Sequence, residues 1–436
     1  MKLKALTIKK FFGVLISSFA LFWYVYSPNS IYFPVSIDKF LLIGFLIWAV
    51  LWHRHELMKL LSRRDVFVIF ALYSLIFIYT FALDLIIIDG IGISYHVSQY
   101  VLQYIPFTIF LFIYMSSIFG EECLDKLFKI LLVLVFLQSI LGLMMFINPD
   151  LKAAIYSIQA KDGDIFKGLG LITRGNGYAS GLLFSIPILH GVIVATLLLS
   201  RTEMSTATKT VFVVLVTAIA ITNARMALVP IIIAMPFIAL RFFSTRGFIA
   251  NSKGIITATL LVILIYIIVP ANLISEDMFN SISRISDRTI GGYANIFGIE
   301  ISGNNERIGE YLLYESTYVD DSLIALIFGT GENAFTATVN QSDIGIINLI
   351  RFGGFLFLGA VLFVTYYLVI KAWRMASNPI YKILILLLGL SYFAASLKGI
   401  VFTEQLMGRF LIMICLFAIL DRIKYSSIRH ENALIR

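Results

Sequence analysis

The sequence is poor in cysteine and in charge, which most soluble and secreted domains use for stability and solubility. Only two cysteines occur in 436 residues, Cys123 and Cys415, and this argues against a disulfide framework. Charged residues make up 14% of the chain, against roughly 25% in a typical soluble protein. Together with a hydrophobic content of 59%, this composition excludes a conventional soluble domain.

Motifs of soluble enzymes are also missing. The sequence has no Walker loop, no paired-histidine metal motif and no nucleophile elbow. Its five histidines are scattered, so we expect neither a metal site nor a cofactor. We interpret the net charge of +8 as a signal of membrane topology and expect no nucleic-acid partner.

The chain does contain a series of long apolar runs. A helix needs about 20 apolar residues to cross a hydrocarbon core of roughly 30 Å. The sequence therefore predicts an all-α, polytopic integral membrane protein with about 12 transmembrane helices and one large outer loop. The predicted spans are residues 11–27, 37–52, 66–84, 97–116, 128–147, 178–200, 210–223, 226–240, 254–272, 344–370, 380–397 and 400–420.

The basic residues predict the orientation of these spans. With the N-terminus inside, 22 of the 34 Lys and Arg residues fall in inner segments and 12 in outer ones. Because basic residues are enriched in cytoplasmic loops, this asymmetry predicts that both termini are cytoplasmic. Residues 1–10 and the apolar run after them have no small-residue cleavage site, so we read them as the first span and not as a signal peptide.

Two connections are long, and both are expected outside. The predicted organisation is residues 1–272 with nine spans and the outer loop 148–177, residues 273–343 as the large periplasmic loop, and residues 344–436 with three spans and a cytoplasmic tail. Loops of this length without a domain of their own are usually functional or disordered.

Several cations are expected near the outer boundary, where the positive-inside rule disfavours them. A guanidinium binds phosphate oxygens in a bidentate manner, so these cations suit a lipid-linked pyrophosphate. For Arg284, Lys398 and Arg409 we favour a structural role, either at lipid headgroups or paired with an acid. The cations are Arg174, Arg225, Arg284, Arg288, Arg307, Arg351, Lys398 and Arg409.

Three segments resemble the Wzy-type O-antigen polymerases and their relatives, the O-antigen ligases. The first is residues 174–178, which open a span. The second is the hairpin 222–228, which is similar to an S-R-x-x-L motif of the family. The third runs from Arg307 through residues 328–331 to residues 342–345 and 351–354, and resembles the large periplasmic loop and its exit helix.

This resemblance implies polymerisation of undecaprenyl-pyrophosphate-linked repeat units at the periplasmic face of a bacterial inner membrane. The activity would be that of a metal-independent glycosyltransferase, with a Wzz-type chain-length regulator as an expected partner. The implied catalytic residues are Arg225, Arg307, Asp343 and Glu310, with either carboxylate as the general base. The implied substrate-binding residues are Arg174, Arg351, Arg288 and Lys398.

Two alternatives remain open at this point. An O-antigen ligase would carry a histidine late in the large loop, and residues 271–343 contain none, which favours a polymerase. A transporter or flippase of lipid-linked glycan would show inverted repeats, broken helices and polar residues at mid-membrane depth. The sequence indicates none of these, because its charges concentrate near the outer end.

Overall fold

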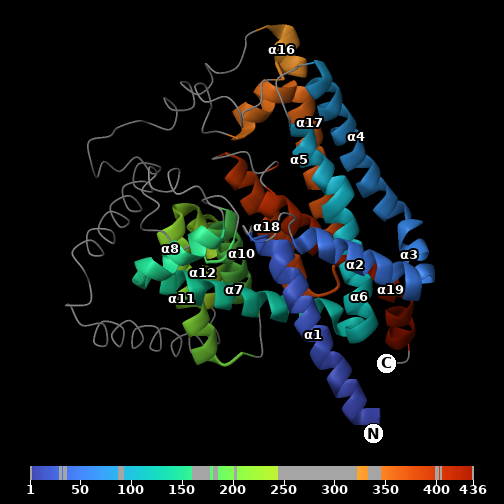
Figure 1. Ribbon diagram of the computed structural model, residues 1–436, viewed down its shortest axis with the longest axis vertical. Helices are drawn as coiled ribbons and strands as arrows, with labels where there is room; N and C mark the ends of the chain where they lie inside the picture. Colours follow the sequence, from blue (N-terminus) through green and yellow to red (C-terminus); the bar gives the residue numbers. More distant parts are fainter. Residues whose placement is uncertain are drawn as a thin grey trace, which may run out of the picture.

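The computed structural model of the chain is helical throughout the part that it describes (Figure 1). No strand occurs in this part, which confirms the all-α class there. The described residues are 2–28, 32, 37–86, 93–159, 177–179, 185–200, 204–243, 322–331, 345–397, 402 and 405–434.

The first half of the chain forms long helices joined by short turns. They are α1 (Lys2–Tyr26), α2 (Ile37–Trp52), α3 (Arg54–Leu61), α4 (Arg64–Ile86), α5 (Ile93–Gln99), the π-helix η1 (Tyr100–Tyr104), α6 (Ile105–Phe119), the 3-10 turn η2 (Gly120–Glu122), α7 (Cys123–Ile147) and α8 (Pro149–Ile158). The later elements are α10 (Ser185–Leu199), α11 (Thr206–Asn223), the 3-10 turn η4 (Arg225–Ala227), α12 (Leu228–Phe243), α16 (Leu323–Phe328), α17 (Gly345–Met375), α18 (Pro379–Ser396) and α19 (Gln405–Leu434).

Local sequence explains where several helices begin. The side chain of Asn148 accepts hydrogen bonds from two backbone amides of α8, and Pro149 occupies the first helical position, where its missing N–H costs nothing. The same pair, Asn378 and Pro379, opens α18. Ser322 caps α16 by accepting a bond from the backbone N–H of Ala325 at 3.2 Å.

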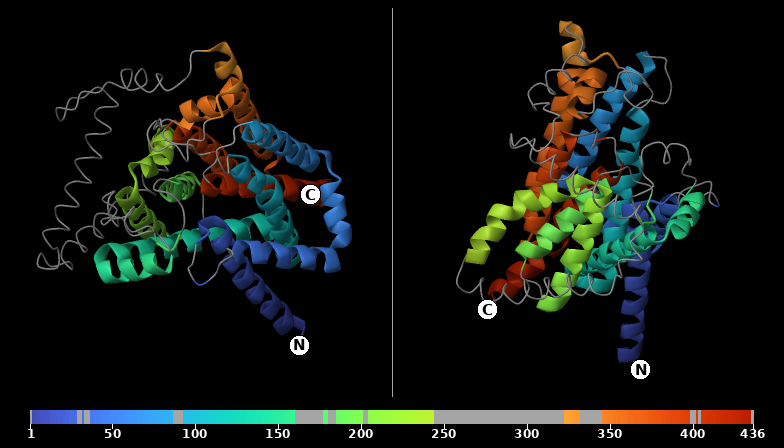
Figure 2. Two further views of the ribbon diagram at one scale, coloured as in Figure 1. Left: turned by 45° about the horizontal axis from the view of Figure 1, so that its top comes forward. Right: turned by 90° about the vertical axis from the view of Figure 1, so that its left-hand side faces the viewer.

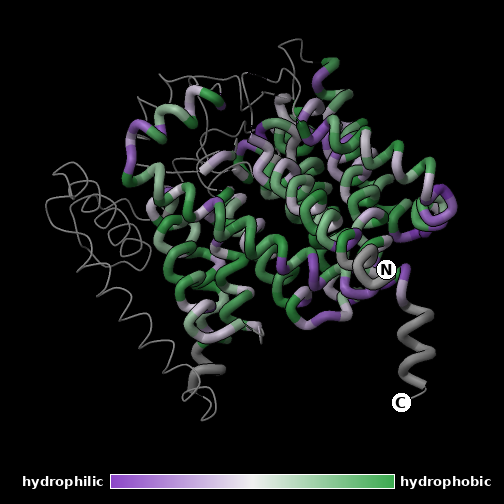
Figure 3. The backbone as a smooth tube through the Cα atoms, turned by 60° about the horizontal axis from the view of Figure 1, so that its bottom comes forward, coloured by the Kyte–Doolittle hydropathy of each residue, from purple (hydrophilic) through white to green (hydrophobic). Residues whose placement is uncertain are grey.

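Among the described residues, six helical stretches are long and apolar enough to cross a membrane. One of them, Ile93–Ile147, covers two predicted spans that are separated by η2. Each predicted span coincides at least in part with a helix, except 254–272, which lies outside the described residues. Figure 3 shows hydrophobic residues along the helices and hydrophilic residues gathered at turns. The chain is therefore a helical membrane protein, and the number of twelve crossings stays a prediction.

Contacts at one end of the molecule join four segments that the predicted topology places inside. These segments are residues 53–65, the α6–α7 turn, the α17–α18 turn and the end of α19. The contacts among these segments agree with the predicted alternation of inner and outer connections. Which side of the membrane they face stays a prediction. The polar contacts at this end are Lys371–Asp65 at 2.7 Å, Asn378–Asp125 at 2.6 Å, Lys424–Ser116 at 2.8 Å and Lys424–Glu56.

Two groups of helices lie on either side of α18 (Figures 1 and 2), and α1, α2, α3, α6 and α19 belong to neither. One group contains α4, α5, α16 and α17, and the other contains α7, α8 and α10 to α12. Helix α18 contacts α17 on one side and both α10 and α12 on the other. The first turn of α1 and the last turn of α19 lie at the same end of Figure 1, as expected if both termini are on one side.

Candidate functional site

Helix α17 is broken at Gly354, which has φ 67° and ψ −172°. A backbone in this left-handed region ends one helical segment and starts another, and glycine adopts it without steric cost. The break leaves carbonyl groups of the preceding turn without their intrahelical partners. The sequence indicated a continuous span here, and the structure shows that this span is broken.

The freed carbonyls of α17 accept hydrogen bonds from the segment that follows α16. Thr330 donates to the carbonyl of Arg351 through its backbone N–H at 2.8 Å and through its hydroxyl at 3.0 Å. The N–H of Gly331 donates to the carbonyl of Phe352 at 2.9 Å. The two parts of the third resemblance segment, residues 328–331 and 351–354, are therefore bonded directly to each other.

Two glycines allow this backbone-to-backbone approach. A Cβ atom on Gly329 would lie 2.2 Å from the carbonyl oxygen of Phe352. A Cβ atom on Gly354 would lie 2.2 Å from the carbonyl oxygen of Ile327. Because both positions also have positive φ, any other residue would be strained there and would push the two segments apart.

Tyr79 of α4 supports the same junction from the side. Its hydroxyl lies 2.9 Å from the carbonyl oxygen of Gly353 and 3.2 Å from that of Phe328, so it can donate its one proton to either. Its ring stacks on Phe357 with the centroids 6.1 Å apart. The break therefore has hydrogen-bonded partners from α4 as well as from the α16 segment.

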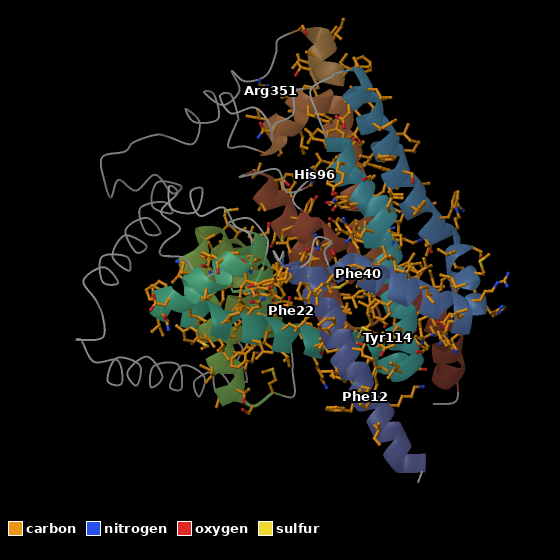
Figure 4. All side chains as sticks on the ribbon, in the orientation of Figure 1. Phe12, Phe22, Phe40, His96, Tyr114 and Arg351 are labelled. Carbon is orange, nitrogen blue, oxygen red and sulfur yellow. The ribbon has the colours of Figure 1, made fainter. Side chains whose placement is uncertain are left out.

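Arg351 lies at this junction, on the turn of α17 before the break. Its backbone carbonyl is held by Thr330, and its side chain is partly buried. Figure 4 shows Arg351 at the end of the molecule that contains α16. A guanidinium held beside a helix break has the chemistry to bind a phosphate or a carboxylate.

An apolar groove of about 580 Å³ runs along α17 and α18. Its lining from α17 comes from both sides of the break, with Ile346 and Leu349 before it and residues between Leu358 and Ile370 after it. The two helices come close because Gly389 has no side chain; a Cβ atom there would lie 2.9 Å from a methyl group of Val369. A groove lined almost wholly by hydrocarbon suits a hydrocarbon chain.

A second polar centre is buried among α1, α2, η1 and α19. The side chains of Arg409 and Asp38 are 2% and 3% exposed and lie 3.6 Å apart. The amide of Gln103 donates to the same Asp38 oxygen, Oδ2, at 2.6 Å. The sequence led us to expect a structural role for Arg409, either at headgroups or beside an acid, and the structure shows the acid pairing.

Backbone carbonyls and tyrosine rings complete the surroundings of this arginine. Arg409 donates to the carbonyl oxygen of Tyr24 at 2.9 Å, and its guanidinium lies 4.9 Å from the ring centre of Tyr104. Tyr104 belongs to the π-helix η1, a type of irregularity that is frequent at functional sites. We missed Asp38 and Gln103 in the sequence, although a carboxylate at the start of an apolar span is a detectable signal.

Of the first resemblance segment the structure describes Gly177 and Tyr178, which lie beside α7. Gln138 of α7 bonds to both the N–H and the carbonyl of Tyr178, at 3.0 and 2.9 Å, and the ring of Tyr178 lies against Phe22 and Trp23. The hairpin between α11 and α12 is confirmed, with η4 at its tip. It packs on α10, where a Cβ atom on Gly191 would lie 2.2 Å from the carbonyl oxygen of Ala227.

Most of the predicted site residues lie outside the part of the chain that the structure describes. The backbone of Arg225 belongs to η4, while its side chain lies outside the described part of the chain. Arg351 is the predicted site residue that the structure describes in full. The residues outside the described part are Arg174, Arg288, Arg307, Glu310, Asp343 and Lys398.

Comparison of the chain with family models, with curated proteins and with solved structures gives no match. The candidate site rests on the structure alone: the break in α17, Arg351 beside it and the apolar groove along the same helix.

Proposed function

We propose that the chain polymerises oligosaccharide repeat units carried on undecaprenyl pyrophosphate, at the periplasmic face of the bacterial inner membrane. The observation that supports this best is the bonding of residues 328–331 to residues 351–354 at the break in α17. It attaches residues 328–331 of the predicted outer loop to the helix that contains Arg351, which suits a site where a loop covers a substrate at the membrane surface.

The proposed reaction is a glycosyl transfer between two lipid-linked glycans. A hydroxyl oxygen of the acceptor repeat unit forms a bond to the anomeric carbon of the donor glycan. The bond from that carbon to the pyrophosphate oxygen breaks, and undecaprenyl pyrophosphate leaves with the bonding electrons. The hydroxyl proton passes to a general base, for which Asp343 and Glu310 are the proposed residues.

The leaving pyrophosphate requires stabilisation of its developing negative charge. Preorganised guanidinium groups can provide this, and we assign the role to Arg225 and Arg307. Arg351 would hold the pyrophosphate, together with Arg174, Arg288 and Lys398. The groove along α17 and α18 would then take part of the polyprenyl chain, because residues on both sides of the same break line it.

A transporter or flippase of lipid-linked glycan is the second candidate, and two observations favour it. The break in α17 is a feature of transporter helices, in which half-helix ends face a substrate. The buried Asp38–Arg409 pair is also typical of a membrane protein with a polar pathway. Neither observation requires a covalent step.

Deletion of the gene in its host separates these functions. Surface polysaccharide that ends after one repeat unit is the result expected for a polymerase. Unattached polymer would indicate a ligase, and complete loss of surface glycan would indicate a flippase. We expect polymerisation by the purified protein to continue in the presence of a metal chelator.

The role of Arg351 can be tested on the same helix with a matched control. We expect Arg351→Gln to lower polymerisation strongly and Arg351→Lys to restore little, because lysine keeps the charge and loses the bidentate fork. Arg374→Gln, in the last turn of α17, should have little effect because that side chain is exposed. Normal polymer from Arg351→Gln at normal abundance would contradict the proposed role.

A further inference from the structure

Helix α16 has one face made of large apolar side chains that the protein leaves uncovered. Leu323 and Ile324 are 72% and 74% exposed, and Ile327 and Phe328 are also exposed. Residues at these spacings share one side of a helix. Ala325 and Leu326 on the other side are partly buried, where α16 contacts α17.

The position of α16 is fixed relative to α4. The carbonyl of Phe328, at the end of α16, faces the hydroxyl of Tyr79 in α4 at 3.2 Å. Tyr79 precedes the last residue of α4, Ile86, by seven residues, or about 10 Å at 1.5 Å per residue. Asp84 lies in the last turns of α4 and accepts a hydrogen bond from the backbone N–H of Ser94. Because a carboxylate is costly in hydrocarbon, we take Asp84 as the start of the polar boundary.

The neighbouring surface of α4 is suited to lipid. This helix of 23 residues is apolar enough to span a membrane, and it exposes Leu75, Ile78 and Leu85 on its outside. Helix α16 lies next to the end of α4 that contains Ile86 (Figures 1 and 2). Residues 322–331 contain no charged side chain, so nothing in the segment opposes contact with hydrocarbon.

We propose that α16 is an in-plane membrane anchor whose Leu323, Ile324, Ile327 and Phe328 insert into the outer part of the bilayer beside α4. Amphipathic helices insert about 5–10 Å below the headgroups, which matches the depth set by Tyr79. The anchor holds residues 329–331, and with them the break in α17, at the same depth below the lipid headgroups. The proposal that α16 is a membrane anchor does not depend on the reaction proposed above.

Site-directed spin labelling of the full-length protein in lipid nanodiscs tests this anchor. Cys123 and Cys415 are both buried, so an added exposed cysteine reacts first, and the unmodified protein gives the background. The test variant is Ile324→Cys. Leu75→Cys in α4 is the control for the bilayer interior, and Lys59→Cys in α3 is the control for water.

Collisions with oxygen report lipid, and collisions with a water-soluble nickel chelate report the aqueous phase. We expect the oxygen-to-nickel ratio at residue 324 to be severalfold higher than at residue 59 and lower than at residue 75. A ratio equal to that at residue 59 would show that α16 is in water. Low collision rates with both reagents would show that protein covers it. Either result would overturn the proposal.

Discussion

The break in α17 and the Asp38–Arg409 centre are two solutions to the same problem, the burial of polar groups in an apolar helical protein. At the break, the polar groups are backbone carbonyls, and their partners are backbone N–H groups and hydroxyls from residues 328–331 and Tyr79. At the buried centre, the polar groups are charged side chains that neutralise each other. The α17 break depends on glycines, which have no side chain to keep the two backbones apart. The buried centre depends on the charges of its side chains.

This difference determines which substitutions each region tolerates. The break requires glycine at positions 329 and 354, because two backbones approach within contact distance there. The buried centre requires that charge is either balanced or absent, because an unpaired buried charge costs far more than a lost bond. Four substitutions test the comparison, in order of decreasing expected effect.

The largest effect is expected for loss of one partner of the buried pair. Arg409→Met leaves the Asp38 carboxylate buried without its cation, and breaking such a pair costs about 3–5 kcal/mol. We expect the double variant Asp38→Leu with Arg409→Met to be more stable than either single variant. Thermal unfolding in nanodiscs, followed by tryptophan fluorescence, measures all three. Equal losses for single and double variants would show that the pair is not the important contact.

A slightly smaller effect is expected at the break. Gly354→Ala adds a Cβ atom 2.2 Å from the Ile327 carbonyl at a position of positive φ. The strain and the displacement of residues 328–331 should cost on the order of 3 kcal/mol. Gly359→Ala is the matched control on the same helix, because nothing lies within 4 Å of a Cβ atom there. Similar unfolding temperatures for the two variants would contradict the described geometry.

Thr330→Val should have a modest effect. It removes the hydroxyl bond to the Arg351 carbonyl and keeps the backbone N–H bond to the same oxygen. A single neutral hydrogen bond contributes about 0.5–1.5 kcal/mol. Thermal unfolding of the purified variant measures the loss of stability. Thr365→Val, in the second half of α17, is the control for the same substitution away from the junction. A loss as large as that of Gly354→Ala would mean that the hydroxyl, and not the backbone, holds the junction.

The smallest effect is expected at the opposite end of the molecule. Lys371 and Asp65 form an ion pair at 2.7 Å, and both side chains are about 30% exposed. Pairs of this kind contribute less than about 1 kcal/mol, since water and salt screen them. Lys371→Met should therefore change the unfolding temperature little, and the change should shrink in high salt. A loss that persists at high salt would indicate a packing role for the lysine stem.

The helices could be predicted from the sequence, and the reason is local. A run of about 20 apolar residues has one stable form in hydrocarbon, a helix that satisfies its own backbone. The hairpin between α11 and α12 was predicted for the same reason, from two apolar runs around residues 223–225, and the structure confirms it. The Asn-Pro pair that opens α8 and α18 is likewise a local signal.

The candidate site could be predicted only in part. Arg351 was chosen for its charge near a span end, and the structure places it at a junction of two segments. Locally, Gly354 differs from Gly359 in following a second glycine, a pair that favours a turn without requiring one, and only Gly354 breaks the helix. The α16 segment that faces Gly354 decides between them, and its distance along the chain hides that contact from any short sequence window.

The sequence by itself therefore determined that this is an all-helical membrane protein and where most of its helices lie, because apolar length and capping residues act within one segment. The tertiary structure alone decided that Asp38 meets Arg409 and that residues 328–331 bond to residues 351–354. These pairings join segments far apart in the chain. Whether a buried charge or a broken helix is tolerated depends on the partner that folding brings to it.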